Sequence, residues 1–503
     1  MSLVEVEFAF FLPLVLILHW LLPRRAWLQN GFLLLASALF YASWHPRLLW
    51  LLFVTALLDW WVGLRLAATP RPAAEDTTPQ ARAARRVRLA WLLVSLGAGI
   101  GGLAFCKYAG FFVEPFADLL RTLGFVPSTG PLHVILPLGI SFQMLQRLGY
   151  TVDVYYGREP ACRDPLRFAL FVAFFPQLTA GPISRAAQLL PQLAQARRLD
   201  FAAIRTGAGE LLLGFALKAF AADTIGRMVV DPVFAAPGTF APADHVLAMF
   251  ANALQIYADF AGYSLMAIGA GRLFGIQLPE NFSVPFLSRN LPEFWRRWHI
   301  TLNRWLFDFI FTPLTAGHGL MRGRIRTGFL LVFVLSGVWH ASASGAMTGY
   351  VLWGFLHGVG MTVQATFDEQ YRGLCRRDRV WVQRRKSRGY QVAAWALTQL
   401  FFVSTLIPFR AASLGDAAAF LGGFVGTGAQ RVPVHGLTQA TFLGLALALP
   451  IVHHLVALDA CRGLWTRITQ LPAPVRGVLV GLALVALTVV VPVGASTFLY
   501  RQF

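Results

Sequence analysis

Two histidines set in apolar sequence are the residues of this chain best suited to chemistry. His299 ends the string Glu293-Phe-Trp-Arg-Arg-Trp-His, and His340 ends the string Ser336-Gly-Val-Trp-His. An imidazole gains and loses a proton near neutral pH, and an ionisable side chain is costly to keep at membrane depth. Candidate membrane segments flank both histidines, so the pair predicts proton-transfer chemistry within a bilayer.

Of the two histidines, His340 has the more apolar sequence surroundings. It follows the run 329–339, which contains no charged residue, and Gly337 thins the predicted helix beside it. A purely structural histidine would be hydrogen-bonded to a backbone carbonyl or to Ser336, one turn earlier. Because an intramembrane ionisable group is expensive to bury, a functional role is the favoured interpretation of His340.

His299 lies among aromatic and basic residues. A helix around His299 would place Trp295, His299, Leu302 and Leu306 on one face. Positively charged side chains lie near that face: Arg289, Arg296, Arg297 and Arg304. Two interpretations stay open. In one, Trp and Arg anchor an interfacial helix and His299 only packs; in the other, the arginines neutralise an anionic cofactor such as a nucleotide-bearing thioester.

Other polar residues in apolar sequence carry weaker predictions. A metal site made of His357 and the two histidines above lacks a close ligand pair and an accompanying carboxylate, so no metal is expected. The serines near His340, at 336, 342 and 344, lack the sequence context of a nucleophilic serine. Asp259 lies near the middle of a predicted span and needs a partner such as Arg, Tyr or an imidazole. An orienting or structural role is favoured for it.

The elements that hold these residues are predicted to be membrane helices. The chain has 503 residues, of which 56% are hydrophobic and 13% are charged, whereas a soluble domain has about 25% charged residues. Apolar runs long enough to cross a hydrocarbon layer of about 30 Å recur along it. The expected fold class is therefore all-α polytopic membrane protein, with a single membrane domain over residues 1–503.

We expect about eleven or twelve transmembrane helices, and two interrupted segments. The candidate spans are 8–22, 27–44, 47–66, 89–112, 132–150, 206–230, 244–272, 326–342, 347–367, 391–409, 440–459 and 477–498. The apolar stretches 166–182 and 294–314 contain Pro, Gly or charge and are expected to be re-entrant, since broken backbone at membrane depth needs surrounding protein or a water-filled cavity.

The charge pattern points to a membrane and away from nucleic acid. The net charge is +19, and the basic residues occur in short clusters between apolar runs, as the positive-inside rule produces. Segments 65–88, 272–298 and 372–388 are therefore predicted to be cytoplasmic, and membrane lipid is an expected partner. The four cysteines are scattered and predict neither a disulfide framework nor a zinc site.

Strings spread over nearly the whole chain resemble the membrane-bound O-acyltransferase family, in its bacterial branch of alginate O-acetyltransferase-like proteins. They include Lys107-Tyr, Pro137-Leu-Gly-Ile-Ser-Phe-Gln, Phe174-Phe-Pro-Gln-Leu, Gly181-Pro-Ile, Gln255-Ile-Tyr-Ala-Asp-Phe-Ala-Gly-Tyr-Ser, Glu280-Asn-Phe, Glu293-Phe-Trp-Arg-Arg-Trp-His-Ile-Thr-Leu, Gly337-Val-Trp-His, Phe409-Arg and the terminal Tyr500-Arg-Gln-Phe. The chain departs from the family pattern at Pro313-Leu-Thr-Ala-Gly-His and after His340, at Ala341-Ser-Ala-Ser-Gly. These departures leave the reaction class intact and put the identity of the acceptor in doubt.

The resemblance implies a ring of tilted helices around a thin central region, where a cytosolic acyl donor meets an acceptor across the membrane. It implies that His340 is the catalytic histidine and that His299 is its companion. The segment of Arg and Trp before His299 is similar to the part of the family that lines the donor-side tunnel. Arg289, Arg296, Arg297 and Trp298 are therefore the expected donor-binding residues.

These observations predict transfer of an acyl group, specifically acetyl, from cytosolic acetyl-CoA to a hydroxyl on the extracytoplasmic side, for O-acetylation of an exported polysaccharide such as alginate. His340 would be the general base, and His299 would stabilise the developing oxyanion or the donor. An extracytoplasmic acetyltransferase is the expected partner that relays the group to the polysaccharide. The expected location is the bacterial inner membrane, with multiple spans and no metal cofactor.

Two other classes of function compete with acyl transfer. In a proton-coupled transporter or flippase, His340, His299 and Asp259 would form a proton relay without covalent chemistry. The chain shows no internal repeat of the kind that marks many transporters, which counts against that class. In a scaffold that only anchors a partner, both histidines would be packing residues.

Overall fold

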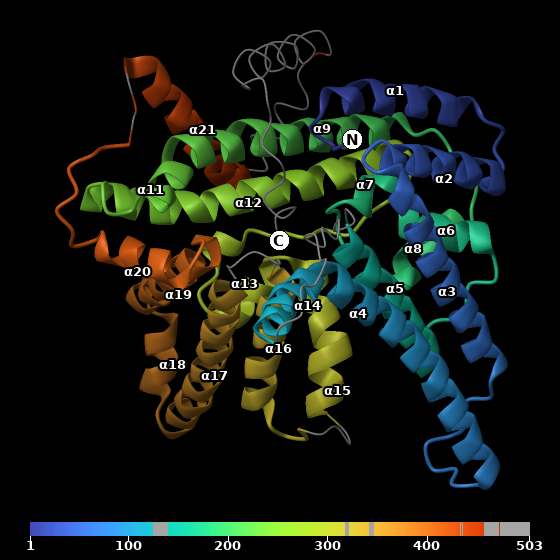
Figure 1. The fold of residues 1–503 in the computed structure, drawn as a ribbon. Coiled ribbons are helices and arrows are strands. Elements are labelled where there is room, and N and C mark those ends of the chain that lie inside the picture. The colour runs from blue at the N-terminus through green and yellow to red at the C-terminus, as the bar shows by residue number, and fades with distance from the viewer. Residues whose placement is uncertain are drawn as a thin grey trace. The chain divides into compact units, whose positions relative to one another are not determined.

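The computed structural model describes residues 1–123, 139–316, 321–341, 347–432, 434, 436–456 and 472 (Figure 1). Within them the regular elements are helices, apart from one isolated β-bridge between Phe240 and Gln430. The predicted all-α fold is confirmed. The predicted span 477–498, the serines at 342 and 344 and the terminal string from Tyr500 lie outside the described residues.

Several helices are long and apolar enough to cross a membrane. Four segments in the described part of the chain meet that description: Pro46–Ala68, Pro79–Tyr108, Arg388–Arg410 and Leu437–Leu455. Three shorter apolar helices are Val6–Leu21, Ala26–Ala42 and Ile325–His340. All seven coincide with predicted spans, because length and hydropathy dominate this signal. The full number of spans and their arrangement in a ring stay predictions.

The chain forms two compact units, and both are discontinuous in sequence. The first unit is Met1–Leu212 with Tyr263–Pro279, and the second unit is Leu213–Gly262 with Glu280–Phe503. Helices α9 (Phe201–Phe215) and α12 (Pro242–Leu273) contribute residues to both. The expectation of a single membrane domain stays a prediction.

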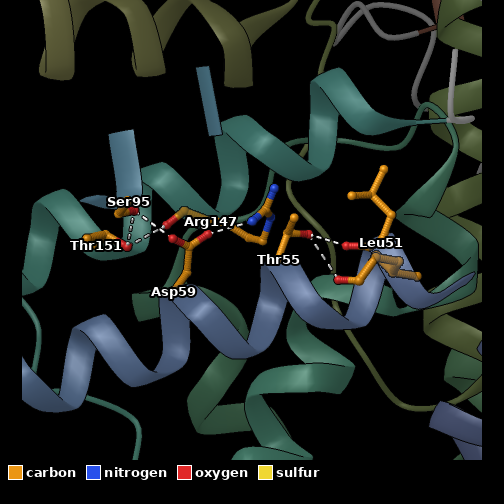
Figure 2. Close-up of polar contacts among 7 residues, drawn as sticks. Leu51, Thr55, Asp59, Ser95, Arg147 and Thr151 are labelled. Atoms are coloured by element: carbon orange, nitrogen blue, oxygen red, sulfur yellow. Dashed lines mark hydrogen bonds and ion pairs between the residues drawn. The ribbon is translucent and has the colours of Figure 1, made fainter. Parts of the chain in front are cut away.

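The first unit is built from helices, and three of them, α3, α4 and α5, enclose a buried ion pair. Its elements are α1 (Val6–Leu21), α2 (Ala26–Ala42), α3 (Leu49–Ala68), α4 (Pro79–Thr122), α5 (Ile140–Tyr156), α6 (Pro165–Ala173), α7 (Phe175–Leu178) and α8 (Ala186–Leu193). Figure 2 shows Asp59 of α3 directed toward Arg147 of α5, with 2.6 Å between the carboxylate oxygen and the guanidinium nitrogen. Ser95 of α4 donates to the same carboxylate at 2.6 Å. These bonds satisfy charges that apolar surroundings would otherwise disfavour.

The predicted interruption of the 166–182 stretch is present. Helix α6 ends at Ala173 and α7 begins at Phe175, with Phe174 between them in a non-helical conformation. Pro176 lies in the first turn of α7, where its missing N–H leaves no helical bond unmade. That this segment is re-entrant stays a prediction.

The second unit contains both His299 and His340. Its elements are the π-helices η2 (Ala216–Ala222), η3 (Gly226–Val230) and η5 (Phe307–Phe311), and the α-helices α10 (Asp223–Ile225), α11 (Asp231–Ala235), α13 (Leu291–Arg297), α14 (Ile300–Leu306), α15 (Thr312–Thr315), α16 (Ile325–His340), α17 (Met347–Arg377), α18 (Arg379–Lys386), α19 (Arg388–Arg410), α20 (Leu414–Gly422) and α21 (Gly436–Val456). Helices α16 and α17 pack along one another. This pairing fixes the position of His340.

Candidate active site

His340 is the last residue of α16, and aromatic rings enclose it. Its side chain is 3% exposed. The imidazole lies edge-to-face against Trp353 of α17 and Phe409 of α19, with ring centroids 5.5 Å apart in each pair. Trp339 contacts it from the same helix at 4.7 Å. The surroundings predicted from the uncharged run before His340 are therefore present, and they exclude bulk water from the ring.

Close helix packing holds His340 against α17. A Cβ at Gly337 would overlap the carbonyl oxygen of Tyr350, and a Cβ at Gly354 would overlap the carbonyl oxygen of Phe333. Only glycine allows the two backbones to approach this closely. The predicted thinning of the helix at Gly337 thus has a structural purpose: it brings His340 against the ring of Trp353.

The predicted helical face shared by Trp295 and His299 is wrong, whereas the interruption expected within 294–314 is present. Helix α13 ends at Arg297 and α14 begins at Ile300, with Trp298 and His299 between them. His299 has φ 43° and ψ 54°, the left-handed conformation that non-glycine residues rarely adopt. Trp295 and His299 therefore do not share one helical face.

Hydrogen bonds from a preceding segment explain this break. Ser283 N–H donates to the carbonyl of Arg297 at 2.9 Å, and Ile300 N–H donates to the carbonyl of Asn281 at 2.9 Å. The amide oxygen of Asn281 accepts from the Thr301 hydroxyl at 2.6 Å. These bonds pair backbone groups that a continuous helix would have paired internally, so the left-handed residue is held by its surroundings. We call residues 280–283 the strap.

The ring of His299 faces helix α12. It is 2% exposed and lies edge-to-face against Phe260, with centroids 4.5 Å apart. The neighbouring Asp259 pairs with Lys218 of η2 at 2.8 Å, and Lys218 also pairs with Asp223 at 2.6 Å. The expectation that Asp259 needs a polar partner is confirmed, and Lys218, which the sequence did not single out, is one such partner. The signal available in the sequence was that Lys218 is one of only three lysines.

A cavity of about 590 Å³ adjoins α13 and α14. Its polar lining includes Arg296, Arg304, Asn303 and Asp308, and its apolar lining includes Trp295, Phe333 and Met361. Two guanidinium groups at one apolar cavity suit an extended ligand with phosphates at one end. The sequence indicates Arg304 only as nearby charge, because the cavity is lined by residues of five separate elements, α13, α14, η5, α16 and α17.

The structure brings only part of the predicted donor-binding set to this cavity. Arg296 lines it, whereas Arg289, Arg297 and Trp298 are not among its lining residues. Arg297 pairs with Glu293 at 2.7 Å, and Arg289 donates its backbone N–H to the same carboxylate at 2.9 Å. Trp298 is buried and stacks on Phe294, with centroids 5.6 Å apart. Their part in donor binding stays a prediction.

His357 of α17 is completely buried beside the cavity wall. Its ring contacts Trp295 and Trp353, with centroids 4.9 Å apart in each pair. The sequence indicates this residue only as a candidate metal ligand. Among the residues that the structure describes, no group of three or more His, Cys, Asp or Glu is placed to hold a metal ion. The three histidines thus do not form the metal site considered for them.

Comparison with known proteins gives a consistent family assignment. The family model of MBOAT, the membrane-bound O-acyltransferase family, matches residues 160–406. A probable alginate O-acetylase AlgI of Pseudomonas syringae pv. tomato is 34% identical over 444 residues, covering 88% of this chain and 78% of that protein. A peptidoglycan O-acetyltransferase of Helicobacter pylori is 31% identical, over 78% of this chain and 73% of that protein.

A more distant relative carries a different acyl group in its name. A teichoic acid D-alanyltransferase of Bacillus subtilis is 28% identical over 254 residues, covering 48% of this chain and 62% of that protein. The family model covers the segments that carry His299, His340 and His357, so the site described above lies within the matched region. The chain therefore belongs to the membrane-bound O-acyltransferase family and is an acyltransferase.

Proposed function

We propose that this protein transfers an acetyl group from cytosolic acetyl-CoA to a hydroxyl on the extracytoplasmic side of a bacterial inner membrane. The observation that carries the proposal is the imidazole of His340, buried and enclosed by aromatic rings in the matched region of an O-acyltransferase. The names of two relatives, an alginate O-acetylase and a peptidoglycan O-acetyltransferase, support acetyl as the group and a polysaccharide as the final acceptor.

His340 is the general base of the proposed reaction. The acceptor hydroxyl gives its proton to the neutral imidazole as its oxygen attacks the thioester carbonyl carbon. The carbon–sulfur bond then breaks, the acetyl group stays on the acceptor oxygen as an ester, and the CoA thiolate takes the proton from the imidazolium. His340 ends the cycle neutral, and no other reactant is consumed.

His299 supports the same step from the donor side. Its left-handed backbone sets the imidazole at the break between α13 and α14. A preorganised donor in a water-excluded site stabilises the oxyanion that forms when the carbonyl is attacked. The strap and the contact with Phe260 fix this ring before substrate arrives.

The cavity at α13 and α14 is the proposed donor site. Arg296 and Arg304 pair with the phosphates of acetyl-CoA, and the apolar wall accommodates the arm that carries the thioester. The cytoplasmic location predicted for segment 272–298 from its arginines supports a cytosolic entrance. An extracytoplasmic acetyltransferase is the proposed partner that relays the group to the polysaccharide. A transporter without covalent chemistry has no support from the comparisons.

Acetyl transfer from labelled acetyl-CoA by the purified protein tests the proposal. The wild-type chain is expected to deliver label to an added acceptor, either a soluble glycan or the relay protein. His340→Ala should lower the rate by about 10²–10⁴-fold, the usual contribution of a general base. His45→Ala, which changes a half-buried histidine of the first unit, is the matched control and should leave the rate unchanged. Full activity of His340→Ala would remove the base assignment.

A further inference from the structure

Three aromatic rings behind the donor cavity form one mutual contact. Trp295 of α13 lies 5.9 Å from Trp353 of α17, and each indole lies 4.9 Å from His357, measured between ring centroids. All three side chains are buried. We call Trp295, Trp353 and His357 the cage.

A hydrogen bond fixes the tautomer of His357. Its Nε2 lies 2.9 Å from the Thr405 hydroxyl, and that hydroxyl donates its one hydrogen to the carbonyl of Phe402 at 2.7 Å. Nε2 of His357 must therefore be the donor to Thr405. In the neutral ring the other nitrogen, Nδ1, then carries a lone pair and can only accept.

The cage presents three buried polar atoms that have no partner among the described residues. They are the Nε1–H donors of Trp295 and Trp353 and the Nδ1 acceptor of His357. Leaving such atoms unpaired in a protein interior costs free energy, and native structures contain few of them. Two donors and one acceptor within one cluster of contacting rings indicate a site for a polar group.

The position of the cage relates it to the proposed reaction. Trp295 also lines the donor cavity, together with Phe333, whose ring stacks against His357 at 5.9 Å. On its other side the cage reaches the proposed base, because Trp353 contacts His340 at 5.5 Å. A donor that enters from the cavity and delivers its thioester to His340 would pass these three rings.

We propose that the cage binds the secondary amide of the thioester arm, next to the sulfur. An amide carbonyl accepts two hydrogen bonds, which matches the two indole donors, and its N–H donates one, which matches Nδ1 of His357. In acetyl-CoA two methylene groups join this amide to the sulfur, so an amide held in the cage directs the thioester toward His340. A hydrocarbon chain would leave all three atoms unpaired, and a carboxylate has no hydrogen for Nδ1. This inference rests on the proposed donor.

Conservative variants remove one polar atom of the cage at a time. Trp295→Phe and Trp353→Phe each delete an indole N–H and keep a ring in place. His357→Gln keeps a donor for Thr405 and deletes the Nδ1 acceptor. The matched control is Trp27→Phe, because Trp27 is 59% exposed on α2 of the first unit. Elution of each variant as a monodisperse species shows that it folds.

Two truncated thioesters isolate the amide from the rest of the donor. S-acetyl-N-acetylcysteamine keeps the amide beside the sulfur, and S-propyl thioacetate lacks it. Each cage variant is expected to lower kcat/KM for the first compound about tenfold, the effect of losing one hydrogen bond in a dry site, and to leave the rate with the second unchanged. Pantetheine binding, measured by calorimetry without any chemical step, should weaken about tenfold in the same variants.

The results distinguish failure of the cage from failure of the proposed function. Equal effects on both thioesters, or no effect on either, overturn the cage as an amide site. A water molecule alone in the cage would give this pattern together with a lower melting temperature of the variants. Cage-dependent pantetheine binding without acetyl transfer by the wild-type protein would retain the cage and overturn the proposed function.

Discussion

Lys218 and Asp259 form a buried ion pair in the second unit, with 2.8 Å between Nζ and the carboxylate oxygen. Asp223 contacts the same ammonium at 2.6 Å, and all three side chains are nearly inaccessible to solvent. Gly262 makes the pairing possible, since a Cβ there would lie 2.9 Å from the backbone nitrogen of Lys218. The residue after Asp259 is Phe260, whose ring contacts His299. The ion pair thus supports the segment on which His299 packs.

Lys218→Met should lower the stability of the protein more than Asp259→Asn does. The change removes the ammonium that both carboxylates contact, and breaking a buried pair in this way costs about 3–5 kcal/mol. Asp259→Asn leaves Lys218 paired with Asp223 and should cost less. Thermal unfolding in detergent measures the order. Equal melting temperatures for wild type and Lys218→Met would contradict a supporting role.

Asn281→Ala should weaken the break that orients His299. It removes an acceptor of the Thr301 hydroxyl, and the loss of one such hydrogen bond costs about 0.5–1.5 kcal/mol. We expect a lower kcat for acetyl transfer, because the backbone at His299 loses part of its restraint. Thr301→Val removes the other partner of the same bond. If the bond is what matters, the double variant should be no worse than Asn281→Ala alone, and additive losses would contradict this explanation.

Gly354→Ala should separate α16 from α17 and displace His340. The added methyl group would overlap the carbonyl oxygen of Phe333, and overpacking of this kind costs about 1–3 kcal/mol. Gly373→Ala is a control on the same helix, since a Cβ at Gly373 meets nothing within 4 Å. That change should stabilise the helix by about 0.5–1 kcal/mol and leave activity intact. A loss in Gly373→Ala comparable to that in Gly354→Ala would contradict the overlap with Phe333 as the cause.

The two histidines show what the sequence could and could not predict. The enclosure of His340 followed from local information, because an uncharged run and a glycine one turn earlier are enough to indicate a buried helix end. The break at His299 depends on Asn281 and Ser283, which lie in an earlier segment and bond across to Arg297, Ile300 and Thr301. Helical periodicity contains no term for such long-range bonds, so it placed Trp295 and His299 on one face although the left-handed residue separates their helices.

The cavity at α13 and α14 could not be predicted from the sequence for a related reason. Its wall combines Trp295 of α13, Phe333 of α16 and Met361 of α17, and no spacing rule relates residues on separate helices. The arginine cluster indicated an anionic ligand, but only the fold separates Arg296, which lines the cavity, from Arg297, which pairs with Glu293. In the same way, the sequence indicated that Asp259 needs a polar partner, but only the tertiary structure shows that Lys218 is one.

Arg296→Gln and Arg304→Gln should each raise KM for acetyl-CoA several-fold while changing kcat little. Both side chains are exposed in the cavity wall, so each is expected to contribute up to about 1 kcal/mol of screened attraction to the donor phosphates. The effect should shrink as ionic strength rises, because salt screens exposed charges beyond about 10 Å at 0.1 M. S-acetyl-N-acetylcysteamine carries no phosphate, so its KM should be unchanged. Arg372→Gln, an exposed site on α17 outside the cavity lining, is the matched control. A salt-dependent rise in KM for Arg289→Gln but not for Arg296→Gln would move the phosphate site to the start of α13.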